Sequence, residues 1–411
     1  MKLYSDIIII GGGTTGWLTA IFAKKYCKNS NVKLIESTEI GILGAGEGST
    51  PNLVNFLSEL EIDEKDLLEK VNGTKKLGIH FHNWSNIEYS YVHGFGDRSE
   101  EDESVYAYHF DARLLANYLK EIAIIRGVEY IDGKIKNIEQ NEKGDISNIK
   151  LENNINYDTN FVFDCSGFYR LTPKLFKLKW KTYTDELMVN TAIPFFLKRN
   201  DITVNTRTNA IAMDYGWVWQ IPLKNRWGCG YIFDKKLISE DAAKTEIINK
   251  FGNDIQVNKT IDFQPGTYEK TLINNCLIVG LSSGFLEPLE ATSIMTIVVQ
   301  LKTFKKYLNN TLTENEFNKS INNIQRQNMI MIRHHYNCSK NDTTFWKKYK
   351  EKKLPKELEK IVSNKNLMSI KNNTELKKAL NVPKSTKLQF PIESYVLINN
   401  GNFPKKNITL I

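Results

Sequence analysis

A run of four isoleucines that leads into a glycine-rich turn constrains the fold of this chain more than any other feature. The run covers residues 7–10, and Gly11, Gly13 and Gly16 follow it in the spacing GxGxxG. A membrane span needs roughly 20 apolar residues, so this short run is better explained as a buried strand. A strand, a glycine turn and a helix start in this order predict the opening of a βαβ unit.

The residues after the turn complete that unit. Helical periodicity covers 17–27, and a second apolar strand over 32–35 ends at Glu36, about 25 positions after Gly11. Parallel strands joined by a helix are the building block of doubly wound α/β folds. We therefore expect an α/β protein whose N-terminal part is built on a parallel sheet.

The same turn has the residues that a bound dinucleotide requires. Gly11 permits the tight turn, Gly13 lets a pyrophosphate approach the backbone, and Gly16 allows close helix packing. The helix start supplies amide groups for the phosphates, and Glu36 can accept hydrogen bonds from ribose hydroxyls. A merely structural turn is the alternative. The turn alone leaves FAD and NAD both open.

Further along the chain, the sequence pattern changes from a parallel to a more antiparallel type. The stretch between about 181 and 265 alternates apolar and polar residues, which favours a second, more antiparallel sheet inserted into the nucleotide-binding fold. The other expected elements are a helix over 110–125, strands at 128–131, 162–163 and 276–279, long helices over 290–308 and 313–335, and exposed helix and loop over 347–385.

These patterns predict four consecutive regions. They are the first part of an FAD-binding domain (1–180), an inserted substrate-side sheet (181–265), the return of the FAD-binding domain with the halide site (266–310) and a C-terminal helical region (311–411).

Composition excludes several classes of protein. The formal charge of +8 comes from 55 basic and 47 acidic residues without a long single-sign block, so neither nucleic acid nor a membrane is predicted as a partner. The five cysteines are far apart and form no metal-binding spacing, and we expect no metal. A reducing cytoplasm is the simplest location for such a chain.

Several segments in chain order resemble those of flavin-dependent halogenases of the tryptophan halogenase type. The segment Trp217–Pro222 matches the signature WxWxIP of that family. The other matching segments are Gly44–Leu53, Val71–Trp84, His109–Ala112, Asp164–Gly167 and Phe285–Ser293. The resemblance covers about residues 5 to 350, with a fainter similarity over 394–404, so the chain is identified as a short member of this family.

The resemblance implies a fold, an activity and a set of partners. The fold would be an FAD-binding Rossmann-like domain of the glutathione reductase type, with an inserted mixed or antiparallel sheet and C-terminal helices. The enzyme would use reduced FAD, oxygen and halide to form hypohalous acid, which halogenates an electron-rich, indole-like aromatic. A separate NAD(P)H-dependent flavin reductase would supply the reduced FAD. A homo-oligomer, by default a dimer, is also expected.

Lys76 and Glu290 stand where the family has its two catalytic residues. The resemblance implies that the lysine holds or carries hypohalous acid next to the substrate, a role that suits an ammonium with three donors. A solvated surface lysine would otherwise be the default. Glu290 would orient the acid or take the proton lost by the arene. The alternative is a helix N-terminal acid that complements the dipole, and both roles can hold together.

Which lysine faces inward depends on the register of the strand that begins at Lys76. Alternation places Lys76, Gly78, His80 and His82 on one face. The neighbouring Lys75 would then point outward. We interpret His80 and His82 as satisfied polar residues rather than ligands.

The resemblance assigns the remaining site residues. Thr292 and Ser293 would bind the halide through backbone amides at a helix start, and relatives commonly have glycine where Ser293 stands, which leaves the halide preference open. The expected FAD contacts are Gly11, Gly13, Thr14, Thr15, Gly16, Glu36, Glu47, Gly280, Ser282 and Ile294.

Trp217, Trp219, Ile221 and Pro222 would shield the flavin from the organic substrate and so disfavour monooxygenation. The two tryptophans lie on one face of a strand, and core packing explains them equally well. Gly280-Leu281-Ser282 replaces the Gly-Asp of many FAD monooxygenases. An FAD-dependent monooxygenase or other oxidoreductase, and a flavin-binding protein without turnover, remain the alternative functions.

The substrate side differs from the family pattern. Only 24 residues separate Trp84 from His109, where halogenases of free tryptophan have a much longer insertion that contributes to the indole pocket. The predicted site is therefore more open, for an electron-rich aromatic other than free tryptophan.

Overall fold

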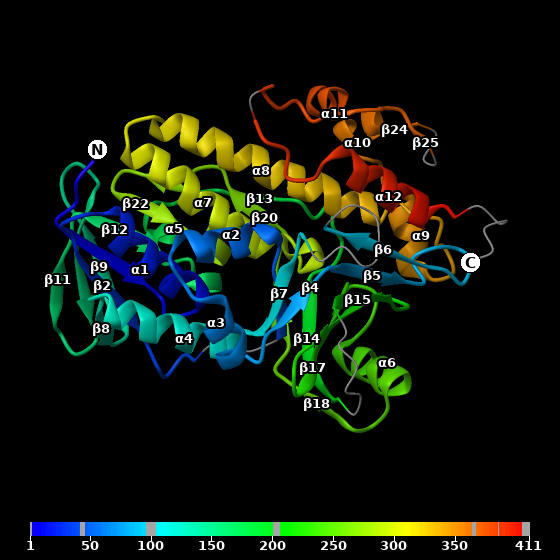
Figure 1. Ribbon diagram of the computed structural model, residues 1–411, viewed down its shortest axis with the longest axis horizontal. Helices are drawn as coiled ribbons and strands as arrows, with labels where there is room; N and C mark the ends of the chain where they lie inside the picture. The colour runs from blue at the N-terminus through cyan, green and yellow to red at the C-terminus, as the bar shows by residue number, and fades with distance from the viewer. Residues whose placement is uncertain are drawn as a thin grey trace.

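A computed structural model describes residues 2–41, 46–95, 104–199, 206–363, 367–384 and 386–404. Figure 1 shows a parallel sheet with its helices at one end of the molecule and a second sheet at the other. The long helix α8 (Glu314–His335) runs from the first end to the second, and the C-terminal helices gather around its far end. This arrangement brings the last quarter of the chain onto the second sheet.

The first sheet is the predicted parallel sheet. Its order is β21-β22-β12-β1-β2-β8, parallel except for the edge strand β21. The strands are β1 (Asp6–Ile10), β2 (Asn31–Glu36), β8 (Glu129–Asp132), β12 (Phe161–Asp164), β21 (Leu272–Ile273) and β22 (Cys276–Ile278). Helices α1 (Thr14–Tyr26) and α4 (Ala112–Ile125) contact each other beside it. Because both faces are covered, these strands form continuous apolar runs rather than alternating ones.

The second sheet is mainly antiparallel. Its order is β18-β14-β17-β16-β15-β5-β6, with β19 also paired to β14. The strands are β5 (Gly78–His82), β6 (Ser90–Gly94), β14 (Thr191–Lys198), β15 (Arg207–Ala212), β16 (Gly216–Pro222), β17 (Arg226–Phe233), β18 (Ile255–Val257) and β19 (Ile261–Asp262). Strands β5 and β6 come from the N-terminal part of the chain, and β5 pairs with β15 in parallel. Helix α6 (Glu240–Phe251) contacts β17.

A small sheet joins the two halves. It consists of β3 (Gly46–Gly48), β7 (Ala107–Asp111) and β4 (Thr74–Lys76) in that order, and β3 also contacts β16 and β17 of the second sheet. The strand expected from Lys76 onward is therefore two strands, because Leu77 leaves the small sheet and its amide bonds to Thr206 before β5 begins.

The remaining elements surround these sheets. The helices are α2 (Pro51–Glu59), α3 (Glu64–Lys70), α5 (Leu171–Leu175), α7 (Thr292–Leu308), α9 (Thr344–Glu351), α10 (Lys356–Ile361), α11 (Asn373–Ala379) and α12 (Ile392–Asn402), with 3-10 turns at Gly167–Tyr169, Gly280–Ser282 and Leu289–Ala291. The other strands are β9 (Ile135–Gln140), β10 (Ile146–Leu151), β11 (Asn156–Asp158), β13 (Trp180–Thr182), β20 (Gly266–Tyr268), β23 (Gly284–Phe285), β24 (Val362–Ser363) and β25 (Leu367–Met368).

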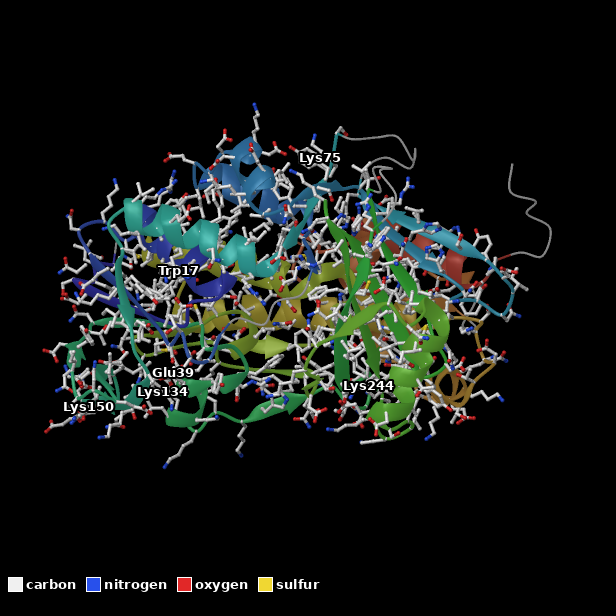
Figure 2. All side chains as sticks on the ribbon, turned by 90° about the horizontal axis from the view of Figure 1, so that it is seen from below. Trp17, Glu39, Lys75, Lys134, Lys150 and Lys244 are labelled. Carbon is white, nitrogen blue, oxygen red and sulfur yellow. The ribbon has the colours of Figure 1, made fainter. Side chains whose placement is uncertain are left out.

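Two large apolar cores match the two ends of the molecule. One lies around α1, α4 and α7, and the other packs the second sheet against the C-terminal helices. The second core includes Leu358, Ile361 and Leu376, each fully buried. The expectation that 347–385 is simply exposed is therefore wrong, because its short helices bury one apolar face each. Figure 2 shows that charged side chains cover the outside, including Lys150 and Lys244.

The fold class expected from the sequence is confirmed. A Rossmann-like parallel sheet, an inserted antiparallel sheet and C-terminal helices are all present. Within the described ranges, no helix combines the length and the apolar character that crossing a membrane would require. All five cysteines are free and buried.

Candidate active site

The glycine turn between β1 and α1 has the shape that the sequence predicts. Gly11 has a φ of +104°, and a side chain at Gly16 would overlap the Gly11 carbonyl oxygen. Only glycine tolerates both conditions. Helix α1 begins at Gly13 without a capping side chain, and the space in front of the Gly13 Cα is open. Free helix N-terminal amides beside open space are what a pyrophosphate needs.

Glu36 lies at the end of β2, directly against this turn. A side chain at Gly12 would overlap the Glu36 carboxylate, so the acid and the glycine backbone are in close contact. Lys120 lies 3.4 Å from Oε2 of Glu36, and both side chains are largely buried. The carboxylate is therefore held at the edge of the turn, where a ribose would follow the pyrophosphate.

The segment that follows β22 returns to the same place. Gly280 has a φ of +65° and lies against the side chain of Thr15 in the turn. The Ser282 side chain is fully buried, and its Oγ has no hydrogen-bond partner among the described residues. Ile294 is also buried. An unpartnered buried hydroxyl at this place fits a ligand that supplies its partner, and FAD fits this set of residues.

Glu47 lies between the two sheets on β3. Burial, together with the charge of the nearby Asp111, raises the pKa of its carboxyl to about 7. Asp111 in turn caps α4 and pairs with Arg226 of β17 at 2.5 Å. Part of the family-like segment around it, residues 42–45, lies outside the described residues.

Lys76 is buried and Lys75 is exposed. Only 2% of Lys76 is accessible, and its Nζ donates to the carbonyl oxygen of Ser49 at 3.0 Å. Burial lowers the pKa of this ammonium to about 8, although Glu290 favours the charged form. Lys75 instead lies at the surface (Figure 2), where its Nζ is 4.3 Å from the centre of the Tyr106 ring. The strand register thus places the predicted lysine inside, but not on a common strand with His80.

Glu290 is buried within the 3-10 turn Leu289–Ala291, which directly precedes α7. Glu290 and Ala291 have positive φ values of 63° and 52°, two consecutive strained residues at the point where α7 begins. Glu290 Oε1 lies 2.8 Å from Nδ1 of His93 and 2.8 Å from Nε2 of His335. Burial alone would raise the pKa of Glu290, but the two imidazoles outweigh it and hold the pKa well below its ordinary value.

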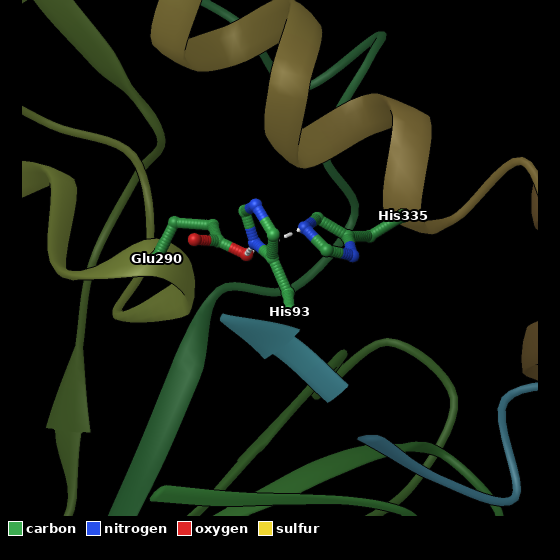
Figure 3. Close-up of side chains that lie close together, drawn as sticks. All are labelled: His93, Glu290 and His335. Carbon is green, nitrogen blue, oxygen red and sulfur yellow. Dashed lines mark hydrogen bonds and ion pairs between the residues drawn. The ribbon is translucent and has the colours of Figure 1, made fainter. Parts of the chain in front are cut away.

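Figure 3 shows the two imidazoles converging on one oxygen of this carboxylate. His93 comes from β6, and His335 is the last residue of α8. The three donor atoms lie within 4.8 Å of one another, a spacing that a metal ion could also use. The sequence pattern did not predict that His93 and His335 contact Glu290. A histidine at the end of an amphipathic helix, beside a second histidine, was the available signal.

A second buried carboxylate lies three residues earlier. Glu287 Oε1 accepts hydrogen bonds from Nε1 of Trp217 at 3.2 Å and from the hydroxyl of Tyr336 at 2.9 Å. Burial raises the pKa of Glu287 to about 8, and these two hydrogen bonds only partly oppose it. The segment that was expected to bind halide is thus tied to α8 twice, through His335 and Tyr336.

The predicted halide and shielding residues lie around this segment. Helix α7 begins at Thr292 and Ser293 without a capping side chain, which leaves its first amides available to an anion. Trp217, Trp219, Ile221 and Pro222 are all buried on β16. His80 and His82 lie apart from this group on β5, half-buried with their rings 3.9 Å apart.

Fold and site together define an α/β protein with a glycine turn of the dinucleotide-binding type and with a buried lysine and a buried glutamate. The family model for tryptophan halogenase matches residues 6–105 and 97–379. The chain therefore belongs to the tryptophan halogenase family, whose members are flavin-dependent enzymes that halogenate aromatic rings.

Individual relatives agree with this assignment. The chain is 28% identical over 420 residues to the tryptophan 7-halogenase RebH of Lentzea aerocolonigenes, covering 85% of this chain and 79% of that protein. It is 27% identical over 428 residues to the 7-chloro-L-tryptophan 6-halogenase KtzR of Kutzneria sp. (strain 744), covering 85% and 82%. The crystal structure of the tryptophan 6-halogenase SttH of Streptomyces toxytricini has the same fold, with a TM-score of 0.88, 24% identity and coverage of 98% and 91%.

Proposed function

We propose that this chain is the halogenating component of a two-component system. It would use reduced FAD, oxygen and halide to form hypohalous acid and would transfer the halogen to an electron-rich, indole-like aromatic. The observation that carries the proposal is the burial of Lys76 together with Glu290, close enough for Glu290 to influence the lysine charge. Burying charged groups is expensive, and buried groups with shifted pKa values cluster at functional sites.

Bound FAD would supply the reduction of oxygen that activates the halide. The glycine turn, Glu36, Gly280 and Ser282 would hold it, with the amides of α7 at Thr292 and Ser293 as the halide site. The sequence has a single glycine fingerprint, so reduced FAD would come from a separate NAD(P)H-dependent reductase.

Lys76 would hold hypohalous acid with its ammonium. Its contact with Ser49 uses one of three N–H donors and leaves two for the acid. The ring then attacks the halogen, so that a carbon–halogen bond forms as the oxygen–halogen bond breaks. The hydroxide that leaves becomes water by taking a proton from the Lys76 ammonium that holds it, and the proton that Glu290 receives from the ring restores this ammonium at the end of the cycle. The ring proton goes to Glu290, whose ionised carboxylate acts as the base.

The two tryptophans of β16 would keep the organic substrate away from the flavin. Both are buried, and Trp217 is fixed by its hydrogen bond to Glu287. A wall held in this way would separate flavin chemistry from halogenation and disfavour hydroxylation.

The substrate would be an aromatic other than free tryptophan. The named relatives act on tryptophan or a chlorotryptophan, but the stretch between Trp84 and His109 is only 24 residues long here. A shorter segment at this place would leave the substrate site more open. The cytoplasm and a homodimer are the simplest setting for such an enzyme.

Halogenation of a substrate panel tests this proposal. The protein is incubated with reduced FAD, oxygen, an aromatic panel rich in indoles, and chloride, bromide or iodide, and the products are identified by mass spectrometry. We expect halogenated products that require halide. Hydroxylated products without halogen would instead favour a monooxygenase, and flavin binding without any product would favour a carrier protein.

A further inference from the structure

We propose that His93 and His335 are positioning residues that clamp one oxygen of Glu290 and leave its other oxygen for the reaction. This inference deepens the proposed function and rests on it. It starts from the geometry of three buried side chains that come from three separate elements: β6, α8 and the turn before α7.

Both contacts fall on the same oxygen. An ionised carboxylate can only accept hydrogen bonds, so Nδ1 of His93 and Nε2 of His335 both act as donors to Oε1. Among the described residues no hydrogen bond reaches Oε2, and Figure 3 shows that oxygen pointing away from both rings. The clamp therefore fixes the rotation of the carboxylate and singles out Oε2 as the working atom.

Each imidazole is itself held in place. Nε2 of His93 lies 3.0 Å from the hydroxyl of Ser394, and the ring of His335 stacks on Phe81 with centroids 4.6 Å apart. Both rings are almost completely inaccessible to water. A ring that is fixed by packing or by a second hydrogen bond positions its partner more exactly than a free side chain does.

The C-terminal helix α12 supports both rings. Ser394 is its third residue, and Asn402 at its other end donates to the carbonyl oxygens of His334 and His335. Asn402 also accepts a hydrogen bond from Tyr91, two residues before His93. One helix thus ties the end of α8 to β6, which explains why a distant C-terminal segment belongs to the site.

The charged and titratable groups around Glu290 decide what the clamp does. They are His93, His335, Lys76 and Tyr91. Two N–H donors on one oxygen stabilise the ionised form. The clamp therefore keeps the base ready to accept a proton in weakly acidic solution, and removing a donor should make Glu290 easier to protonate.

Isosteric pairs of variants test the clamp. His335→Phe and His93→Phe keep a ring but remove the N–H, whereas His335→Gln and His93→Asn keep an N–H at the same distance along the side chain. His82→Phe, at a half-buried imidazole outside the group, is the control. The measurements are kcat and KM for halogenation from pH 5 to 9, FAD binding, and the pH dependence of thermal unfolding of the flavin-free protein.

The Phe variants should lower kcat about tenfold to a hundredfold, the loss expected for one charge-assisted hydrogen bond. KM and FAD binding should stay near wild type. The rate of the Phe variants should fall toward pH 5, where wild-type Glu290 stays ionised, because losing a donor raises the pKa of this buried carboxyl, and the Gln and Asn variants should recover most of both effects. In the flavin-free wild type, protonation of Glu290 at acid pH should lower the stability of the fold, because the folded state holds the pKa of this carboxyl down. The Phe variants should show a smaller drop in stability at acid pH.

Other outcomes overturn the clamp. Phe variants with wild-type rates and no added loss of rate toward pH 5 would leave the histidines a packing role, and Gln or Asn variants no better than Phe would do the same. Stoichiometric zinc in the purified protein, with activity lost on chelation and restored by zinc, would make the group a metal centre. If wild type halogenates nothing, the proposed function fails, while the flavin-free unfolding profiles still decide the clamp.

Discussion

Glu287 and Glu290 stand three residues apart, and both are buried, yet their surroundings move their carboxyl groups in opposite directions. Glu287 meets an indole and a phenol, and burial dominates, so its pKa rises to about 8. Glu290 meets two imidazoles and its pKa falls well below its ordinary value. Near neutral pH Glu287 is mostly a neutral acid that is hydrogen-bonded to Trp217 and Tyr336, and Glu290 is an anion that can accept a proton.

Hydrogen-bond partners, rather than depth of burial, therefore decide which of these two carboxyl groups is ionised. Pairs of titratable groups whose surroundings drive their pKa values apart mark acid and base roles. Here the consecutive residues His335 and Tyr336 serve one carboxylate each. The end of one helix therefore sets the surroundings of both carboxyl groups. Four experiments test the difference between them.

The largest effect on activity is expected at Lys76, the buried cation whose charge Glu290 favours. Lys76→Met should lower halogenation by about a thousandfold, because a preorganised donor in a buried site is lost. FAD binding should persist, since the glycine turn is untouched. The matched control is Lys75→Met at the exposed neighbour, and product formation by mass spectrometry is the measurement. Equal activity in both variants would remove Lys76 from the mechanism.

The next effect separates the two carboxylates directly. Glu290→Gln should lower kcat about a hundredfold by removing a general base. Glu287→Gln should lower it less than about tenfold, because a neutral amide can still accept from Trp217 and Tyr336. Both rates are measured at pH 7. Similar losses in the two variants would mean that the contrast in charge has no consequence for catalysis.

The pH dependence of stability provides a third test, at Glu287. In the unfolded chain Glu287 loses its proton near pH 4.5, whereas in the folded chain it keeps the proton to about pH 8. Because only the unfolded chain ionises between these values, the free energy of unfolding falls as pH rises through this range. Glu287→Gln removes this slope. The free energy of unfolding of the variant should therefore exceed that of wild type by a margin that grows by up to about 1.4 kcal/mol for each pH unit. Urea unfolding at pH 5, 6, 7 and 8 measures this, and parallel profiles would refute the raised pKa.

The smallest effect is expected for the hydrogen bond between Trp217 and Glu287. Trp217→Phe loses the indole hydrogen bond to Glu287 and should destabilise the protein by about 1 kcal/mol more than Trp219→Phe. Trp219 is the control because its indole nitrogen has no hydrogen bond among the described residues. Urea unfolding at pH 7 compares them. Equal losses would show that packing alone holds the tryptophan pair.

The local parts of this fold follow from the sequence. The strand, turn and helix around Gly11 to Gly16 are set by neighbouring residues, and so is the strand position that buries Lys76 and exposes Lys75. Periodicity likewise predicts α7 and α8 closely. Each of these features depends on contacts within one element or between adjacent ones.

The clamp on Glu290 could not be read in this way. Its contacts join residues 197 and 45 positions apart in the chain, and no local pattern records which distant side chains meet. The same limit explains the role of α12 and the buried faces of Leu358 and Leu376. Long-range packing decided these points, and sequence pattern alone does not report it.

Halide-dependent product formation tests the central claim most directly. Wild type and Lys76→Met are incubated with reduced FAD, oxygen, bromide and the indole panel, and halogenated products are measured by mass spectrometry at equal FAD occupancy. The account predicts brominated product from wild type and almost none from the variant. Equal bromination by both proteins, or oxygenated product without bromine from wild type, would contradict it.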